Sequence, residues 1–411
     1  MLRRIGTATL LVLILTACGG GAGLADATPS GGKAAPPAQA TPRAQATPPA
    51  QGTPPAKSTP PARNRQAPAT PQPGPVERVL SKLSVEQKVG QLFMPLLYGT
   101  SADTVSGENQ ARYGARTPAK VIAKYHLGGV ILFPQNVKSI GQVVGLTNGL
   151  QRASKQVPLL IGTDQENGAV SRMAALMTAF PGAAQIGAAG DPAYARAVAR
   201  ATGKELRALG VNLDFAPVAD VNVNPRNPVI GPRAFGKDPK RVSTMVAAAV
   251  KGFADADVAA TAKHFPGHGD TAVDSHTGLP VIRHTKAEWE RLDAPPFKAA
   301  IGAGVDAVMS AHIVFPKLDP SGDPATLSKP ILTGLLREKL GFKGVISTDA
   351  LNMAGVRQRY NDGEIAVRAV LAGADLLLMP NDLPKAYQAV LGAVKSGRIS
   401  QGRLDQSVTR L

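Results

Sequence analysis

The chain has 411 residues, enough for one large or two smaller domains, and its formal net charge is +17 at pH 7. A basic chain suggests nucleic-acid binding, but only 4% of the residues are aromatic and no basic cluster occurs, so we expect no nucleic-acid partner. Cys18 is the only cysteine, which excludes an intramolecular disulfide and a thiolate zinc site or catalytic thiol elsewhere.

The chain begins with Arg3 and Arg4, followed by a short apolar run from about Ala8 to Leu15. This pattern predicts a secretory signal peptide over residues 1–17, because the apolar run is shorter than the roughly 20 residues of a membrane-spanning helix. The Leu-Thr-Ala-Cys sequence that ends it resembles a bacterial lipobox, which implies acylation of Cys18. We therefore expect an exported, lipid-anchored protein at the outer face of the cytoplasmic membrane or in the cell envelope. Ordinary secretion with an incidental cysteine is the alternative.

Residues 18–75 are rich in proline, alanine and threonine, with near-repeats such as QATPPAQGTPPAKSTPPAR. Such a segment has few apolar side chains to bury, so we predict a disordered, extended linker. Seven basic residues and one acidic residue lie within residues 1–75, so about +6 of the charge precedes the predicted folded domain. The remaining positive charge favours anionic surroundings such as cell-wall polymers or lipid headgroups.

Residues 76–411 alternate short apolar runs with longer amphipathic stretches. The longer stretches predict helices, for example over 191–210 and 328–342, and Ser84 to Gln87 forms a plausible capping box for the first helix. The short runs predict eight strands, at residues 89–97, 128–134, 158–164, 211–218, 258–265, 306–313, 344–350 and 375–380.

Strands that are apolar throughout and alternate with helices predict a parallel sheet covered by helices. Eight such strands favour a single (β/α)8 barrel over 76–411, with a doubly wound open sheet as the alternative. Polar residues follow nearly every apolar run, which is where a barrel places its catalytic groups. The chain has no Gly-x-Gly-x-x-Gly loop between a strand and a helix, so dinucleotide binding has no support.

Four segments carry a resemblance to a known family: GTDQENGAVSRM (162–173), NPVIGPRAFGKDP (227–239), KHFPGHGDTAVDSH (263–276) and GVISTDALNM (344–353). Together they resemble glycoside hydrolase family 3, most closely its single-domain β-N-acetylhexosaminidase branch and the lipoprotein members in it. The resemblance covers nearly everything from Ser81 to Leu411 and implies a barrel enzyme that needs no cofactor.

Asp349 directly follows the apolar run GVIST, which would hold its carboxylate at the mouth of the barrel. Glycoside cleavage with retention needs a carboxylate nucleophile and an acid/base about 5–5.5 Å apart across the anomeric carbon. The residues alone leave two roles open for Asp349, a nucleophile or the N-cap of a helix in LNMAGVRQRY. The resemblance implies the nucleophile.

Asp274 and His276 are two residues apart, so an extended loop would point both side chains the same way. Asp274 could then accept a hydrogen bond from one imidazole nitrogen, and His276 could act as general acid and base near neutral pH. A turn-capping aspartate beside a solvated histidine is the alternative. The resemblance implies the acid/base pair, because this branch uses such an Asp-His dyad.

Lys263 and His264 end the fifth predicted strand, and the resemblance implies that both hydrogen-bond sugar hydroxyls. Asp164, Arg172 and Arg233 also match sugar-contacting positions, and a carboxylate or an arginine fork suits vicinal hydroxyls. For each of these residues an ordinary salt bridge within the protein is the alternative.

The family motif D-Q-E-G-G reads Asp-Gln-Glu-Asn-Gly over residues 164–168 in this chain. The departure is at Asn167, just before Arg172. Because asparagine tolerates left-handed backbone better than most residues, the turn can survive this change.

Half of the six histidines of the chain lie between residues 263 and 276, which raises the possibility of a zinc site. Their spacing across Pro-Gly turns differs from that of helix-borne zinc ligands, so we expect no metal. His268 and Asp270 are expected to shape the loop instead. His312 is expected either to line the site or to support it by packing, and His126 and His284 are expected at the surface or at helix ends.

The sequence predicts a retaining, exo-acting β-N-acetylglucosaminidase that removes terminal N-acetylglucosamine from small oligosaccharides or muropeptides of the cell wall and works as a monomer. An alternative keeps the site but uses phosphate as the acceptor, since a neutral histidine repels an anion less than a glutamate does. A second alternative, from another class, is a non-catalytic lipoprotein that binds the cell wall.

Overall fold

The computed structural model describes residues 74–411. The predicted signal peptide (1–17), Cys18 and nearly all of the predicted linker (18–75) lie outside the described residues. Within residues 74–411, no helix combines the length and the apolar character that crossing a membrane requires.

Each of the eight predicted apolar runs contains one strand of the described structure. These strands are β1 (Phe93–Met94), β2 (Gly129–Ile131), β3 (Leu160–Thr163), β6 (Leu213–Asp214), β7 (Ala259–Phe265), β8 (Ala307–Ser310), β9 (Val345–Ser347) and β10 (Leu377–Leu378). A short antiparallel hairpin, β4 (Gln165–Asn167) and β5 (Val170–Ser171), follows β3 and was not predicted. The strands are shorter than the runs, partly because helix α2 takes up residues as far as Gln91.

The central sheet is parallel and curled, with the strand order β2-β3-β6-β7-β8-β9. This order follows the chain without reversal, so the doubly wound alternative is wrong. Strands β1 and β10 pair with each other in parallel. Single parallel bridges, Leu96 to Ile131 and Ser347 to Leu376, connect this pair to the two ends of the six-stranded sheet.

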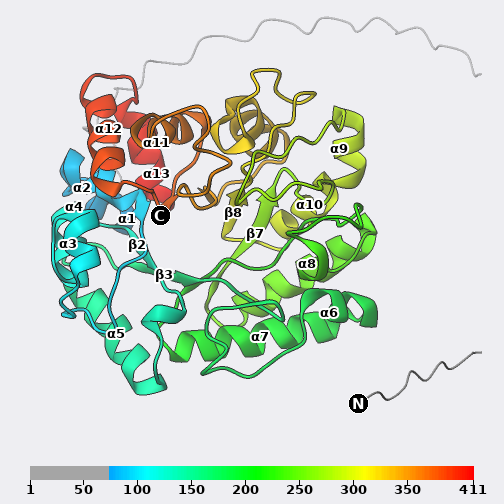
Figure 1. Ribbon diagram of the computed structural model, residues 1–411, viewed down its shortest axis with the longest axis horizontal. Coiled ribbons are helices and arrows are strands. Elements are labelled where there is room, and N and C mark those ends of the chain that lie inside the picture. Colours follow the sequence, from blue (N-terminus) through cyan, green and yellow to red (C-terminus); the bar gives the residue numbers. More distant parts are fainter. Residues whose placement is uncertain (1–73) are drawn as a thin grey trace, which may run out of the picture. The chain divides into compact units, whose positions relative to one another are not determined.

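Helices lie outside the strands, as Figure 1 shows for β2, β3, β7 and β8 at the centre. The helices are α1 (Pro75–Leu80), α2 (Val85–Gln91), α3 (Gly107–Tyr113), α4 (Pro118–Tyr125), α5 (Ile140–Ala153), α6 (Ala183–Ala189), α7 (Pro192–Ala208), α8 (Pro239–Ala254), α9 (Lys286–Leu292), α10 (Ala294–Gly302), α11 (Asp362–Ala372), α12 (Leu383–Lys395) and α13 (Gln401–Arg410). Short helical turns are η1 (Pro134–Asn136), η2 (Gly231–Arg233), η3 (Ala325–Leu327) and the π-helical η4 (Pro330–Lys339).

The helix starts confirm the local sequence signals. Ser84 and Gln87 form the predicted capping box of α2, and Asp191 caps α7 by accepting from the Ala193 N–H. The predicted serine cap before η4 is also present, since Ser328 accepts from the Ile331 N–H. Side-chain caps of this kind satisfy backbone donors that the helix itself leaves unpaired.

The curled sheet has apolar residues on both faces, which explains its continuously apolar strands. The outer face packs against the helices in one large cluster of buried side chains. The inner face holds a separate cluster contributed by β1, β2, β6, β8 and β10 with their flanks: Met94, Ile131, Leu213, Phe215, Met309, Leu376 and Leu378. The interior is therefore a packed core, and the polar residues are left to the carboxyl ends of the strands.

A buried carboxylate fastens the last helix to the sheet. Asp375, just before β10, is fully buried and accepts a hydrogen bond from Ser407 of α13. Three guanidinium groups also contact it, those of Arg337, Arg403 and Arg410. Removing this carboxylate would leave three cations close together without their shared counter-ion.

We expect Asp375→Ala to lower the free energy of unfolding by about 3–5 kcal/mol, the range for breaking a buried ion pair from one side. Chemical denaturation of the full chain measures this loss. Asp103→Ala, at an exposed position, is the matched control and should change stability by less than about 0.5 kcal/mol. Equal stability of the two variants would contradict the role given to Asp375.

Candidate active site

A cavity of about 420 Å³ opens at the carboxyl ends of the strands. It is lined by all eight described residues that the sequence predicted for the site: Asp164, Arg172, Arg233, Lys263, His264, Asp274, His276 and Asp349. These residues come from positions up to 185 apart in the chain, and the parallel sheet brings them to one edge.

Asp349 lies two residues beyond the end of β9, and one of its oxygens accepts from the Ala350 N–H at 2.7 Å. It caps no helix, because residues 351–360 form turns and α11 starts later with Asn361 as its N-cap. The alternative role of Asp349 as a helix cap is therefore wrong. Its carboxylate borders the cavity.

The pKa of Asp349 is lowered below its ordinary value. Burial alone would raise it, but His312, His264, the Ala350 N–H and the Lys263 ammonium together outweigh burial. Burial also lowers the pKa of both histidines, that of His264 strongly, so both imidazoles are neutral near pH 7. The Ala350 N–H and the Lys263 ammonium favour the ionised form of Asp349 at that pH as well.

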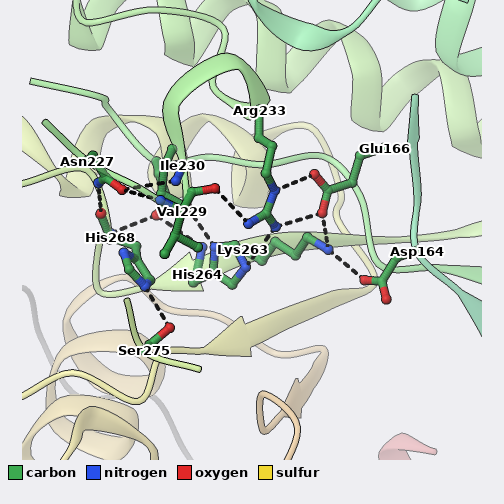
Figure 2. A network of polar contacts seen from close by, with 11 residues as sticks. Asp164, Glu166, Asn227, Val229, Ile230, Arg233, Lys263, His264, His268 and Ser275 are labelled. Atoms are coloured by element: carbon green, nitrogen blue, oxygen red, sulfur yellow. Dashed lines mark hydrogen bonds and ion pairs between the residues drawn. The ribbon is translucent and has the colours of Figure 1, made fainter. Parts of the chain in front are cut away.

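Glu166 is the centre of a buried network of ion pairs (Figure 2). Arg233 donates to both of its oxygens at 2.8 Å, and the Lys263 ammonium lies 2.6 Å from one of them. Lys263 also donates to Asp164 at 2.8 Å. Burial would raise the pKa of Glu166, but the Lys263 and Arg233 charges lower it to about 2.

The sequence placed Glu166 at a strand end without assigning it a role, although a signal was available. In the β4–β5 hairpin the side chains of Asp164 and Glu166 both line the cavity, while the buried Gln165 accepts from the Met173 N–H. Alternation along an extended segment produces this arrangement. The expected left-handed turn is confirmed at Asn167, whose φ is 66°.

Arg172 makes a cation–π contact with an aromatic ring, and its only ion pair among the described residues is a long one. Its guanidinium carbon lies 4.9 Å from the centre of the Phe133 ring, and its Nε lies 3.8 Å from Asp164 Oδ2. This Nε is buried and has no hydrogen-bond partner among residues 74–411. The guanidinium therefore retains hydrogen-bonding capacity for a ligand in the cavity.

His264 is oriented by Asp220, which is completely buried. The His264 Nδ1 atom lies 2.7 Å from Asp220 Oδ2, and the backbone N–H groups of His264 and His268 donate to Asp220 Oδ1. The carboxylate favours the tautomer with hydrogen on Nδ1. The opposite nitrogen, Nε2, is then an acceptor, and Arg233 Nη2 lies 3.4 Å from it.

The predicted contact between Asp274 and His276 is present, but a turn forms it, and not an extended loop. One oxygen of Asp274 lies 2.8 Å from both the backbone nitrogen and the Nδ1 atom of His276. The Gly278 N–H donates to the Asp274 carbonyl at 2.9 Å, which closes the turn. Burial would raise the pKa of Asp274, but the hydrogen bonds from His276 lower it. The carboxylate thus stays ionised and fixes hydrogen on His276 Nδ1.

Two further histidines belong to the site: His268 lines the cavity, and His312 lies behind it. His268 lies 3.0 Å from the Ser275 hydroxyl through its Nε2 atom, which confirms its predicted part in shaping the loop. His312 is fully buried between Thr326 and the Ala350 carbonyl, at 2.8 and 3.0 Å. Of its two predicted roles, packed support is the one the structure has.

No group of three or more His, Cys, Asp or Glu side chains within residues 74–411 is arranged to hold a metal ion. The histidines of the site instead pair with carboxylates and hydroxyls, as described above. What the cavity offers is an ionised carboxylate, an exposed imidazole with its own carboxylate, and a set of fixed polar groups.

The described domain matches known proteins over most of its length. A beta-hexosaminidase A from Pseudoalteromonas piscicida is 40% identical over 362 residues, which is 80% of this chain and 60% of that protein. The solved family 3 beta-N-acetylglucosaminidase from Paenibacillus is 46% identical with a TM-score of 0.75, over 80% of this chain and 61% of that one. The chain thus spans about three fifths of these two relatives. A solved beta-N-acetylhexosaminidase from Beutenbergia cavernae, 32% identical with a TM-score of 0.71, is matched over 97% of its length and 80% of this chain.

The model of the glycosyl hydrolase family 3 N-terminal domain matches residues 84–411, which contain every residue that lines the cavity. The chain therefore belongs to glycosyl hydrolase family 3.

Proposed function

We propose that the chain is a retaining, exo-acting β-N-acetylglucosaminidase. The observation that carries this proposal is that an ionised Asp349 and the Asp274–His276 pair border the same cavity. Relatives named beta-hexosaminidase and beta-N-acetylglucosaminidase support the choice of sugar.

In the proposed reaction Asp349 attacks the anomeric carbon and forms a covalent glycosyl ester. His276 donates its Nε2 proton to the glycosidic oxygen as that bond breaks, and the alcohol leaves. His276 then takes a proton from water, whose oxygen attacks the ester and restores Asp349. Asp274 holds the imidazole throughout and stabilises its charged form.

The remaining residues of the cavity would hold the sugar. Asp164 and Arg172 present oxygens and N–H groups suited to vicinal hydroxyls, and His264 presents an acceptor nitrogen. Lys263 and Arg233 are tied to Glu166, so their positions are set before substrate arrives. The cavity of about 420 Å³ lies within the range of small-molecule sites, roughly 300–1,000 Å³, which favours one terminal sugar over a long glycan.

Several wider features belong to the same proposal. The two single bridges that link the β1–β10 pair to β2 and β9 support a closed (β/α)8 barrel as the frame. The lipobox-like sequence at Cys18 and the excess of positive charge support an enzyme anchored by lipid outside the cytoplasmic membrane and acting on muropeptides of an anionic cell wall.

Asp349→Asn should abolish turnover, with kcat lower by at least about 10³-fold, because no carboxylate remains to form the ester. Hydrolysis of an aryl N-acetyl-β-glucosaminide measures the loss. Asp191→Asn makes the same chemical change at an exposed helix cap and should leave kcat unchanged. Wild-type turnover in a correctly folded Asp349→Asn protein rules out the mechanism.

His276→Ala should affect substrates according to their leaving group. A substrate that leaves as a sugar alcohol needs the proton, so kcat/KM should fall by about 10²–10⁴-fold. A 2,4-dinitrophenyl glycoside leaves without protonation and should lose little. The measurement is the loss in kcat/KM for each of these two substrates relative to wild type. An equal loss for both would contradict the role of His276 as general acid.

The sugar and the acceptor are tested together with aryl β-glycosides of N-acetylglucosamine, glucose and xylose, each with and without phosphate. We expect N-acetylglucosamine to have the highest kcat/KM and free sugar to be the product. A preference for glucose contradicts the N-acetyl assignment, and a sugar 1-phosphate product identifies a phosphorylase.

A further inference from the structure

The loop between β7 and α9 (residues 266–285, here the acid/base loop) has a buried base and an exposed tip. The tip, residues 271–278, carries Asp274 and His276, and the His276 side chain is 59% exposed. The base, residues 266–270, is packed against neighbouring elements. The Ala354 N–H also donates to the His276 carbonyl at 3.4 Å, and the base fixes the end of the loop from which the tip projects.

Two glycines bring the base of the loop into direct contact with its neighbours. A Cβ atom at Gly267, where φ is +142°, would lie 2.5 Å from Asp293 Oδ1, and one at Gly269 would lie 1.7 Å from the Val221 carbonyl oxygen. The buried Trp289 of α9 also donates from its indole nitrogen to the Pro266 carbonyl at 2.9 Å. The junction of α9 and α10, with Trp289 and Asp293, thus packs closely behind the base of the loop and is here called the wall.

His284 joins this wall to the loop through both of its ring nitrogens. Its Nδ1 lies 2.7 Å from Asp293 Oδ2 in the wall, and its Nε2 lies 3.0 Å from Asp270 Oδ2 at the end of the base. His284 does lie next to a helix start, as expected, but its side chain is 11% exposed, and neither carboxylate partner was anticipated. A neutral imidazole can donate only once, so donation to both carboxylates needs the imidazolium.

The charge state agrees with this geometry. The hydrogen bond to Asp293 is the largest effect on His284, and with the Asp270 contact it raises the pKa of His284 to about 9 against the opposing effect of burial. Near neutral pH the ring therefore carries a positive charge.

We propose that His284 is a positioning residue for the acid/base step: by bridging Asp293 and Asp270, it fixes the base of the loop that presents Asp274 and His276. This inference rests on the proposed role of His276. His284 does not line the cavity, so it acts through the loop and not on the substrate.

Asp270 separates this role from a merely structural one. Its side chain is 40% exposed, while that of Asp293 is 2% exposed. Removing the Asp270 side chain therefore leaves the buried His284–Asp293 pair in place and removes only the contact between His284 and the base of the loop. A structural role would lower thermal stability and slow every substrate equally, whereas a misplaced general acid slows only substrates that need protonation.

The experiment compares chitobiose with the 2,4-dinitrophenyl N-acetyl-β-glucosaminide in the full-length protein. We expect Asp270→Ala to lower kcat/KM for chitobiose by about tenfold, a fraction of the usual contribution of general acid catalysis, and to change the dinitrophenyl substrate less than about twofold. Asp270→Glu, which keeps the carboxylate, should recover part of the loss. Asp103→Ala is the control and should match wild type with both substrates.

A double-mutant cycle completes the test. In a His276→Ala background, Asp270→Ala should cause no further loss with chitobiose, because the group it positions is gone. Equal losses for both substrates, no loss for either, or additive losses in the double variant overturn the inference. If His276→Ala alone shows no dependence on the leaving group, the proposed acid/base role fails, and the inference fails with it.

Discussion

The site is organised around one buried ion-pair network, in which Lys263 lies between Asp164 and Glu166 while Arg233 holds Glu166 from the other side. These groups come from the end of β3 and its hairpin, from η2 and from β7, so the network fixes three separate segments relative to one another. Buried charges are tolerated here because each is paired and hydrogen-bonded. Replacing Glu166 would remove the carboxylate that pairs with both Arg233 and Lys263.

This network also explains why the cations in the cavity form no ion pair with the Asp349 carboxylate. Glu166 accepts two hydrogen bonds from the Arg233 guanidinium and forms an ion pair with the Lys263 ammonium. Burial would raise the pKa of Asp349, but His312, His264, a backbone N–H and the Lys263 ammonium together lower it. Two carboxylates in one cavity thus have different surroundings, one enclosed by ion pairs and the other presented to the cavity.

The two halves of the proposed mechanism are built differently. Asp349 lies two residues beyond β9 of the curled sheet, whose neighbouring strands hold the segment that leads to it. His276 lies on an exposed loop tip, where it is held by its turn with Asp274 and by the Ala354 N–H, which donates to its carbonyl. Such a division is common in barrel enzymes, where loops at one face vary while the strands stay fixed.

Much of the fold could be predicted because strands buried on both faces are apolar throughout, as in VGQLFMPLL and GGVILFP. The positions of the site residues were also predictable, since polar side chains after such runs must lie at one edge. Their partners were not. The position of Glu166 depends on a hairpin of five strand residues. The contacts of His284 depend on how the two ends of the acid/base loop pack against each other and against Asp293. Contacts of that kind are set by tertiary packing, and no periodic pattern of apolar residues along the sequence marks them.

The exposure of His276 has a consequence for the timing of the reaction. An imidazole that is 59% exposed exchanges its proton directly with bulk water and buffer, without a buried relay of donors. In the proposed mechanism the His276 proton leaves with the alcohol, and the attacking water supplies the next one. Protonation of His276 by solvent while the glycosyl ester persists would therefore block the base step. A buried acid/base would be shielded from such early protonation, whereas this imidazole is open to it between the two steps.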